Sequence, residues 1–149
     1  MEQDSEQYLE LDYGSEKSTL DDKGRIIIPV EFRKYFQGKL LLTYGNESCA
    51  LIMTPSAWER FVKEIMSQSD KRQRRLLSAK HLQQVQQVEL DKQGRIPISI
   101  PIRTYANLNK SCMVARDQDK MTIWDFEGWY NYLKDNDSEM QAAFDSLEI

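Results

Sequence analysis

The chain has 149 residues, of which 40 % are hydrophobic, and its formal net charge is −4. That length corresponds to one domain or to two small halves that share a core, and the apolar content is sufficient to form one. No apolar run approaches the roughly 18–20 residues of a membrane span, and the first 16 residues lack the basic and apolar regions of a signal peptide. We therefore expect a cytoplasmic protein with no membrane partner.

The charge is unevenly distributed along the chain. Residues 1–16 contain six acids and no base, and residues 135–149 contain five acids and no base. The intervening body carries all 20 Lys and Arg against 13 acids and has a net charge of +7, which suits a nucleic-acid partner. Because the acidic ends are poor in apolar residues, we expect a disordered leader at residues 1–13 and a disordered tail at residues 135–149.

The first repeat, residues 14–66, begins with the two arms of a predicted β-hairpin, KSTLD and RIIIP, around the turn DDKG. Gly24 permits a positive φ in this turn, and Asp21 or Asp22 can accept hydrogen bonds from its amides. A short helix, VEFRKYF, precedes two further apolar strands, KLLLTYG and CALIMTP. Ser56 is the predicted N-cap of the next helix, AWERFVKEIM, whose apolar residues share one face.

Residues 67–84 lack strand alternation and predict a basic, polar linking helix. The second repeat, residues 85–134, then follows the order of the first, with QVELD and RIPIS around KQG, the helix PIRTYANL, the strands KSCMVARD and KMTIWD, and the helix FEGWYNYLKD. A shift of 70 residues gives eight identities in a 16-residue window, where about one is expected by chance. The chain is therefore a duplication in which Leu20, Asp21, Gly24, Arg25, Ile26, Ile28, Arg33 and Tyr35 recur as Leu90, Asp91, Gly94, Arg95, Ile96, Ile98, Arg103 and Tyr105.

Each half has the element order ββαββα and is too small to bury its apolar strands alone. The sequence therefore predicts an α+β fold in which two tandem ββαββα repeats interleave into one barrel-like core. A pseudo-twofold axis would relate the two repeats.

Few residues suggest catalysis or metal binding. His81 is the only histidine and lies in a polar stretch, which favours a surface residue over a metal ligand or a triad member. Cys49 and Cys112 are isolated thiols, which favours small buried residues over a disulfide or a reactive pair. Asp21 and Asp91 could form an acid pair across the pseudo-twofold, but each precedes a Gly turn that needs an acceptor. We expect no enzymatic activity, no catalytic residue, no cofactor, no metal ion and no small-molecule substrate.

The arginines after the two turn glycines are the strongest functional candidates. Turn geometry requires Gly24 and Gly94 but tolerates almost any residue at Arg25 and Arg95, and both halves keep arginine although other turn positions differ. Two turns related by a twofold would present guanidinium forks suited to phosphate, or to guanine O6 and N7 in a major groove. The arginines eight positions further on are also kept in both halves, as Arg33 and Arg103.

The linking helix begins with four bases, Lys71, Arg72, Arg74 and Arg75. Cations at a helix N-terminus oppose its dipole, so helix stability does not account for them. Two interpretations of this segment stay open: its bases contact the DNA backbone, or they form a plain solvated surface.

The doubled D-x-x-G-R-hydrophobic pattern, followed by FRKYF in one half and IRTYANL in the other, resembles the MraZ family of AbrB-like swapped-hairpin DNA-binding folds. LLLTYGNESCALIMTPSAWERF and KMTIWDFEGWYNYL, which close the two halves, resemble that family as well. The resemblance runs from about Gly14 to Lys134 and is specific because motif, duplication, order and spacing agree. It implies the AbrB/MraZ-like swapped-hairpin, double-split β-barrel.

The same resemblance implies a bacterial transcriptional regulator of the division and cell-wall gene cluster, associated with the nucleoid and assembled as a ring-like homo-oligomer. Matching the motif residue by residue implies DNA contacts from Lys23, Gly24 and Arg25 in the first half and from Gly94 and Arg95 in the second.

We therefore predict a sequence-specific regulator that docks Arg-bearing turns on repeated sites in double-stranded DNA. One alternative is a ring-forming protein scaffold that binds DNA only non-specifically, and another is a small hydrolase that uses Asp21 and Asp91. The candidate DNA-binding residues are Lys23, Gly24, Arg25, Gly94, Arg95, Arg33 and Arg103.

Overall fold

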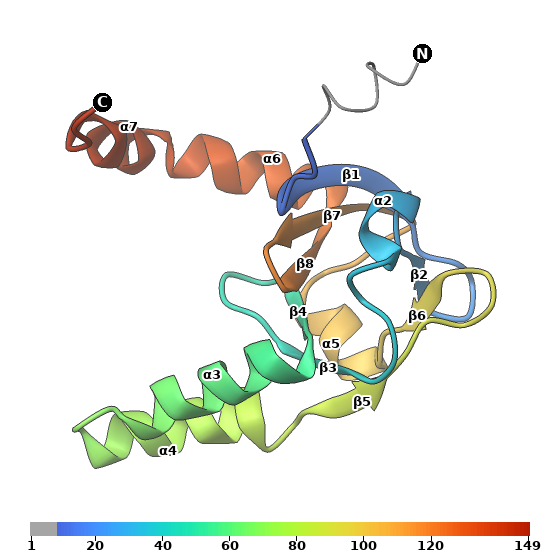
Figure 1. The fold of residues 1–149 in the computed structure, drawn as a ribbon, viewed down its shortest axis with the longest axis horizontal. Helices are drawn as coiled ribbons and strands as arrows, with labels where there is room; N and C mark the ends of the chain where they lie inside the picture. Colours follow the sequence, from blue (N-terminus) through green and yellow to red (C-terminus); the bar gives the residue numbers. More distant parts are fainter. Residues whose placement is uncertain (1–8) are drawn as a thin grey trace.

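A computed structural model describes residues 9–149 and contains two consecutive units of the same element order (Figure 1). The first unit comprises β1 (Tyr13–Thr19), β2 (Arg25–Ile27), α2 (Val30–Arg33), β3 (Leu40–Tyr44), β4 (Ala50–Met53) and α3 (Pro55–Met66). The second unit comprises β5 (Gln86–Val88), β6 (Arg95–Pro97), α5 (Ile100–Tyr105), β7 (Ser111–Asp117), β8 (Lys120–Asp125) and α6 (Phe126–Asp135). The predicted order ββαββα is therefore confirmed in both halves.

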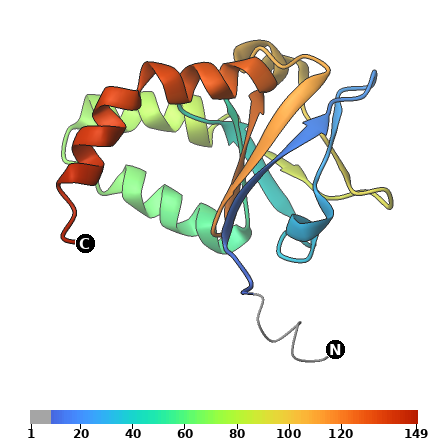
Figure 2. The same ribbon diagram turned by 90° about the horizontal axis from the view of Figure 1, so that it is seen from above.

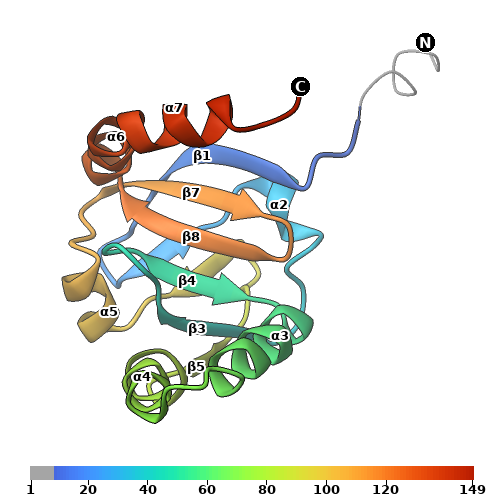
Figure 3. The ribbon, with the colours of Figure 1, turned by 90° about the vertical axis from the view of Figure 1, so that its left-hand side faces the viewer.

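The strands of the two halves interleave. Six strands form one antiparallel sheet in the order β1-β7-β8-β4-β3-β5 (Figure 3). Strands β2 and β6 form a separate two-stranded ribbon (Figure 1). The first strand of each half pairs with the other half, since Tyr13 lies opposite Asp117 in β7 and Leu40 lies opposite Val88 in β5. The prediction of one interleaved barrel with a pseudo-twofold axis is thus confirmed.

The predicted pairing of the two arms around each turn is wrong in detail. The arms of the first turn form no ladder of their own: the isolated bridge between Leu20 and Ile26 and the hydrogen bond from Asp21 N–H to Arg25 O at 2.9 Å join them. Beyond these contacts, β1 pairs with β7 and β2 pairs with β6. The physical reason is burial, because a lone two-stranded hairpin is marginally stable at best in water. Exchange of partners between the halves instead puts Ile26 opposite Ile96, and both side chains are fully buried.

The two halves share a single hydrophobic core inside the barrel. Neither half can bury its own contribution without the other, because β7 and β8 of the second half lie between β1 and β4 of the first, and β3 of the first half pairs with β5 of the second. The large hydrophobic residues of this core that are fully buried are Ile26, Ile28, Phe36, Leu40, Leu42, Ile52, Ile96, Ile102, Val114, Met121 and Ile123.

Helix α3 begins earlier than the sequence predicted. Thr54, not Ser56, is the N-cap: its hydroxyl oxygen accepts a hydrogen bond from the Ala57 amide at 3.2 Å. Pro55 then occupies the first helical position, where its missing N–H costs nothing and its fixed φ suits the helix.

The linker is helical as predicted, with α4 (Lys71–Leu77) followed by a π-helical turn, Ser78–Leu82. His81, however, is buried and not on the surface as predicted. Its Nδ1 donates to the Tyr44 carbonyl at 2.6 Å, while its own carbonyl accepts the Thr43 hydroxyl at 2.6 Å. A polar stretch thus contributes a buried histidine because the π-helical turn folds back against β3 and satisfies backbone groups there.

The two acidic ends of the chain differ in structure over the residues described. Residues 1–8 of the predicted leader lie outside the described residues, and Asp12, further along, lies 3.6 Å from the guanidinium of Arg116. The predicted disorder of the acidic tail is wrong, because the tail forms an exposed helix, α7 (Asp137–Asp145). Asp137 and Glu139 lie in the first turn of α7, where negative charge interacts favourably with the helix dipole.

Candidate nucleic-acid interface

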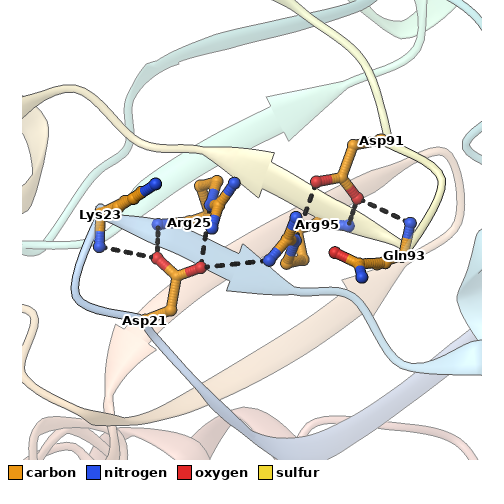
Figure 4. A network of polar contacts seen from close by, with 6 residues as sticks. All are labelled: Asp21, Lys23, Arg25, Asp91, Gln93 and Arg95. Atoms are coloured by element: carbon orange, nitrogen blue, oxygen red, sulfur yellow. Dashed lines mark hydrogen bonds and ion pairs between the residues drawn. The ribbon is translucent and has the colours of Figure 1, made fainter.

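The two Gly-Arg turns have matching hydrogen bonds. In the first turn, Asp21 Oδ1 accepts the backbone amides of Lys23 and Arg25, each at 2.9 Å. In the second, Asp91 Oδ1 accepts the amides of Gln93 and Arg95, also at 2.9 Å (Figure 4). Both aspartates therefore accept hydrogen bonds from the turn amides, as the sequence predicted.

The side chains of Arg25 and Arg95 are held in place by these same carboxylates (Figure 4). Arg25 Nε donates to Asp21 Oδ2 at 2.9 Å, and Arg95 Nε donates to Asp91 Oδ2 at 2.8 Å. Arg95 Nη1 also lies 3.7 Å from Asp21 Oδ2, so an ion pair joins the two turns. The side chains of Arg25 and Arg95 are 30 % and 23 % exposed, and within residues 9–149 their Nη groups make no hydrogen bond, so a ligand can use them.

Both arginines lie on the outward face of the β2–β6 ribbon. Because side chains alternate along a strand, the buried pair Ile26 and Ile96 faces the core while Arg25 and Arg95 face away from it. The ribbon and its two turns lie on the side of the barrel opposite α3, α4, α6 and α7 (Figures 1 and 2). A two-stranded β-ribbon has the right width to enter the major groove of B-DNA.

The turn glycines are required by space as well as by backbone conformation. Gly24 and Gly94 have φ of +77° and +76°, which L residues with a side chain rarely adopt. In addition, a Cβ at Gly24 would lie 2.1 Å from Nη1 of Arg103, and one at Gly94 would lie 2.3 Å from Cζ of Arg33. Each glycine therefore makes room for a guanidinium that belongs to the other half.

This contact explains the second pair of arginines that the duplication keeps. Arg33 lies at the end of α2 and covers the second turn, whereas Arg103, in α5, covers the first. The turn carbonyls cross between the halves as well, since Ile28 N–H donates to Gly94 O and Ile98 N–H donates to Gly24 O, both at 2.8 Å. Each turn is thus held rigidly by the opposite half and carries one arginine from each half.

The electrostatics of this face, which we call the arginine ribbon, favour an anionic partner. The hydrogen bond from the backbone N–H of Arg25 is the main cause of the lowered pKa of Asp21, and that from the backbone N–H of Arg95 is the main cause of the lowered pKa of Asp91. The side chains of the same arginines lower both pKa values further. Both carboxyls are therefore favoured in the charged form, which fits their role as acceptors of the turn amides. The arginine ribbon comprises six bases and three acids, a net charge of +3: Lys23, Arg25, Arg33, Lys92, Arg95 and Arg103 with Asp21, Asp22 and Asp91.

The lowered pKa values predict an acid-sensitive stability. Because folding depresses each carboxyl pKa below its ordinary 3.8, the two aspartates stabilise the fold above that value, and the contribution is lost as the pH falls through the folded-state pKa. An Asp21→Asn/Asp91→Asn variant keeps oxygen acceptors but not the charges. We expect its unfolding midpoint to fall less than that of the parent between about pH 5 and about pH 2. Thermal melts with Asp22→Asn as the matched exposed control measure this, and equal acid sensitivity of all three proteins would contradict it.

The other candidates from the sequence lie elsewhere or are inert. The linker bases of α4 lie on the side of the barrel away from the arginine ribbon (Figure 1), where Asp70 caps the helix by accepting the Arg72 amide at 2.9 Å. Cys49 and Cys112 are buried free thiols as predicted, and burial raises the pKa of each to about 12. Within residues 9–149, no group of three or more His, Cys, Asp and Glu side chains is placed to hold a metal ion, and no helix is long and apolar enough to cross a membrane.

Sequence reasoning missed two features of this site. The first is the packing of Arg33 and Arg103 on the glycines of the opposite half, for which the paired recurrence of Gly and Arg was the available signal. The second is the ion pairing of Arg25 and Arg95 with the turn aspartates through Nε, which the spacing of four residues between Asp and Arg in both turns indicates once the turn is known.

Fold and site together define an α+β protein of two interleaved repeats, a swapped-hairpin barrel whose two Arg-bearing turns flank an exposed ribbon. The family model described as "MraZ protein, putative antitoxin-like" matches residues 13–79 and again residues 82–147. The chain is 33 % identical over 137 residues to a protein of Treponema denticola named "Transcriptional regulator MraZ", covering 90 % of this chain and 95 % of that protein. It is also 33 % identical over 129 residues to a protein of the same name from Frankia alni, covering 81 % of this chain and 85 % of that protein. The chain belongs to the MraZ family.

Proposed function

We propose that this protein is a DNA-binding transcriptional regulator that docks its arginine ribbon on repeated promoter sites as a homo-oligomer. The names of its relatives in Treponema denticola and Frankia alni support regulation of transcription. The resemblance to the family supports the promoter of the division and cell-wall gene cluster as the target, with a nucleoid-associated location in the cytoplasm.

The observation that carries the proposal is the cross-half construction of the arginine ribbon. Four arginines from both halves converge on one narrow two-stranded ribbon, and the glycines and aspartates of the turns position them before any ligand arrives. Guanidinium forks in fixed positions are suited to phosphates and to the acceptor edge of guanine. Rigid positioning also reduces the entropy lost on binding, which favours a specific complex over a loose electrostatic one.

A single ribbon offers few contacts, so useful affinity requires several ribbons on tandem sites. Linked modules multiply weak binding through their effective concentration. Self-association would supply this linkage, and exposed apolar side chains on and after α7, Met140, Phe144 and Leu147, offer a surface for contact between subunits.

Competition against random DNA tests the proposal. A labelled duplex of the division-cluster promoter with its repeats is bound at moderate salt and then challenged with excess random duplex, and a duplex of the same composition with scrambled repeats is the matched control. We expect the promoter complex to survive and the scrambled complex to dissociate, because non-specific binding is driven by counterion release and carries no sequence information. Equal loss of both complexes would favour the alternative, a ring-forming scaffold that binds DNA only through charge.

A further inference from the structure

We infer that the two turns of the arginine ribbon read different base pairs, so that the DNA site of one protein chain has no twofold symmetry although the ribbon does. Gln93 and Lys23 are the residues that discriminate, with Lys92 and Asp22 beside them. The inference rests on the proposed function and adds the kind of DNA sequence that the ribbon recognises.

The backbone frame of the ribbon is symmetric. Ile26 lies opposite Ile96, so a pseudo-twofold axis passes between them and relates Arg25 to Arg95. The turn carboxylates accept matching amide bonds at 2.9 Å, and the φ angles of the two turn glycines differ by only one degree. A symmetric frame with identical side chains would present the same groups at both ends and would select a palindromic site.

The two turns are far enough apart to contact separate base pairs. Gly24 bonds to Ile98 across the ribbon and Gly94 bonds to Ile28, which places the two glycines four residues apart along it. At about 3.3 Å per residue the separation is roughly 13 Å, or about four base-pair steps in a groove that the ribbon follows.

The side chains at the tips break the symmetry. The first turn presents Asp22 and Lys23, whereas the second presents Lys92 and Gln93, and all four residues are exposed. In both turns the backbone amide of the third residue is bonded to the turn aspartate, so Lys23 and Gln93 leave the backbone at equivalent points. The difference between the turns is therefore one of side-chain chemistry and not of position.

The chemistry of these side chains suits different partners. Lys23 has only donors and suits the two acceptors of guanine or a phosphate, whereas the amide of Gln93 has a donor and an acceptor and suits N7 and N6 of adenine. Lys92 attracts phosphate beside Gln93, while Asp22 repels phosphate beside Lys23. The second turn is therefore expected to recognise adenine through Gln93 and to contact the DNA phosphate backbone through Lys92. The first turn is expected to recognise guanine through Lys23.

Two variants that make the turns identical test the inference in full-length protein. Lys92→Asp/Gln93→Lys gives both turns the side chains of the first, and Asp22→Lys/Lys23→Gln gives both the side chains of the second. Each protein is used to select bound duplexes from a random DNA pool. The control is Val30→Ile, which makes an exposed apolar position identical to its counterpart Ile100, also 68 % exposed, without adding a hydrogen-bonding group.

We expect the parent and the control to enrich a non-palindromic motif and the two symmetrised variants to enrich two different palindromes. Each palindrome should repeat one half of the parent motif, and each symmetrised variant should bind the parent motif roughly 5- to 150-fold more weakly. Circular dichroism should show parent-like folding for every variant, because the changed side chains are exposed and the turns are held by backbone amides.

Two results would overturn the inference and are distinguishable from each other. If the parent enriches a palindrome, or if both symmetrised variants enrich the parent motif, the turns do not discriminate and the proposed function stands without this refinement. If the parent enriches no motif while binding all duplexes alike, the proposed sequence-specific function fails and the inference fails with it.

Discussion

A fragment of residues 1–70 is expected to be unfolded, aggregated or a swapped dimer, and not a folded monomer. In this fragment β1 loses β7, β2 loses β6 and β3 loses β5, so the pairing of β3 with β4 is the one ladder between its strands that survives. Unpaired strand edges are templates for association. The fragment also loses half of the shared core, including Ile96, Ile98, Ile102, Val114, Met121 and Ile123.

Circular dichroism melts combined with light scattering measure this effect. The matched control is a chain that ends at residue 136, which lacks the exposed helix α7 but keeps every strand, and it should melt like the parent. A swapped dimer is an expected outcome because a second copy could supply strands equivalent to those of the missing half. A monomeric fragment with a cooperative melt would show that one half can fold alone and would contradict the interleaved core.

Arg25→Ala and Arg95→Ala are each expected to weaken binding to the promoter repeats by about 1–3 kcal/mol, the cost of losing one bidentate base contact. The reason is that each guanidinium presents Nη groups without a hydrogen bond to the described residues on the outward face of the arginine ribbon, although Arg95 Nη1 also lies 3.7 Å from Asp21 Oδ2. Folding should persist, since the backbone amides still occupy the turn carboxylates. Each variant should also relax base preference at one position of the site.

Fluorescence anisotropy at fixed moderate salt checks this prediction. Arg60→Ala is the matched control, because Arg60 is an exposed arginine on α3 that pairs with Asp119 on the side of the barrel away from the arginine ribbon (Figure 1). It removes the same charge without touching the proposed interface. If Arg25→Ala and Arg95→Ala bind like the parent, or lose no more than Arg60→Ala, the docking of Arg-bearing turns is wrong.

Much of this protein could be predicted from residues alone. The duplication is visible as identities at a constant offset, the turns follow from Asp and Gly at fixed spacing, and strands and helices follow from the periods of their apolar residues. These features depend on neighbours within a few residues, so local sequence determines them. The element order ββαββα and the candidate arginines of the interface followed in the same way.

Other features depended on contacts between distant residues. The sequence favoured pairing between the arms of each turn, but burial of Ile26 against Ile96 requires each arm to pair with the other half. The burial of His81 in a polar stretch likewise depends on carbonyl and hydroxyl groups of β3, about 37 residues earlier in the chain.

The arginine ribbon likewise combines features that local sequence determines with features that depend on contacts between distant residues. The sequence by itself determined that each turn needs glycine, because the chain reverses there with a positive φ, and that an arginine follows it. Only the tertiary structure decided that Arg103 lies on Gly24 and Arg33 on Gly94, and that Arg95 pairs with Asp21. The physical reason is that hydrogen bonds within a turn join residues close in the chain, whereas packing and ion pairing join residues that the shared core brings together from 60 to 80 positions apart.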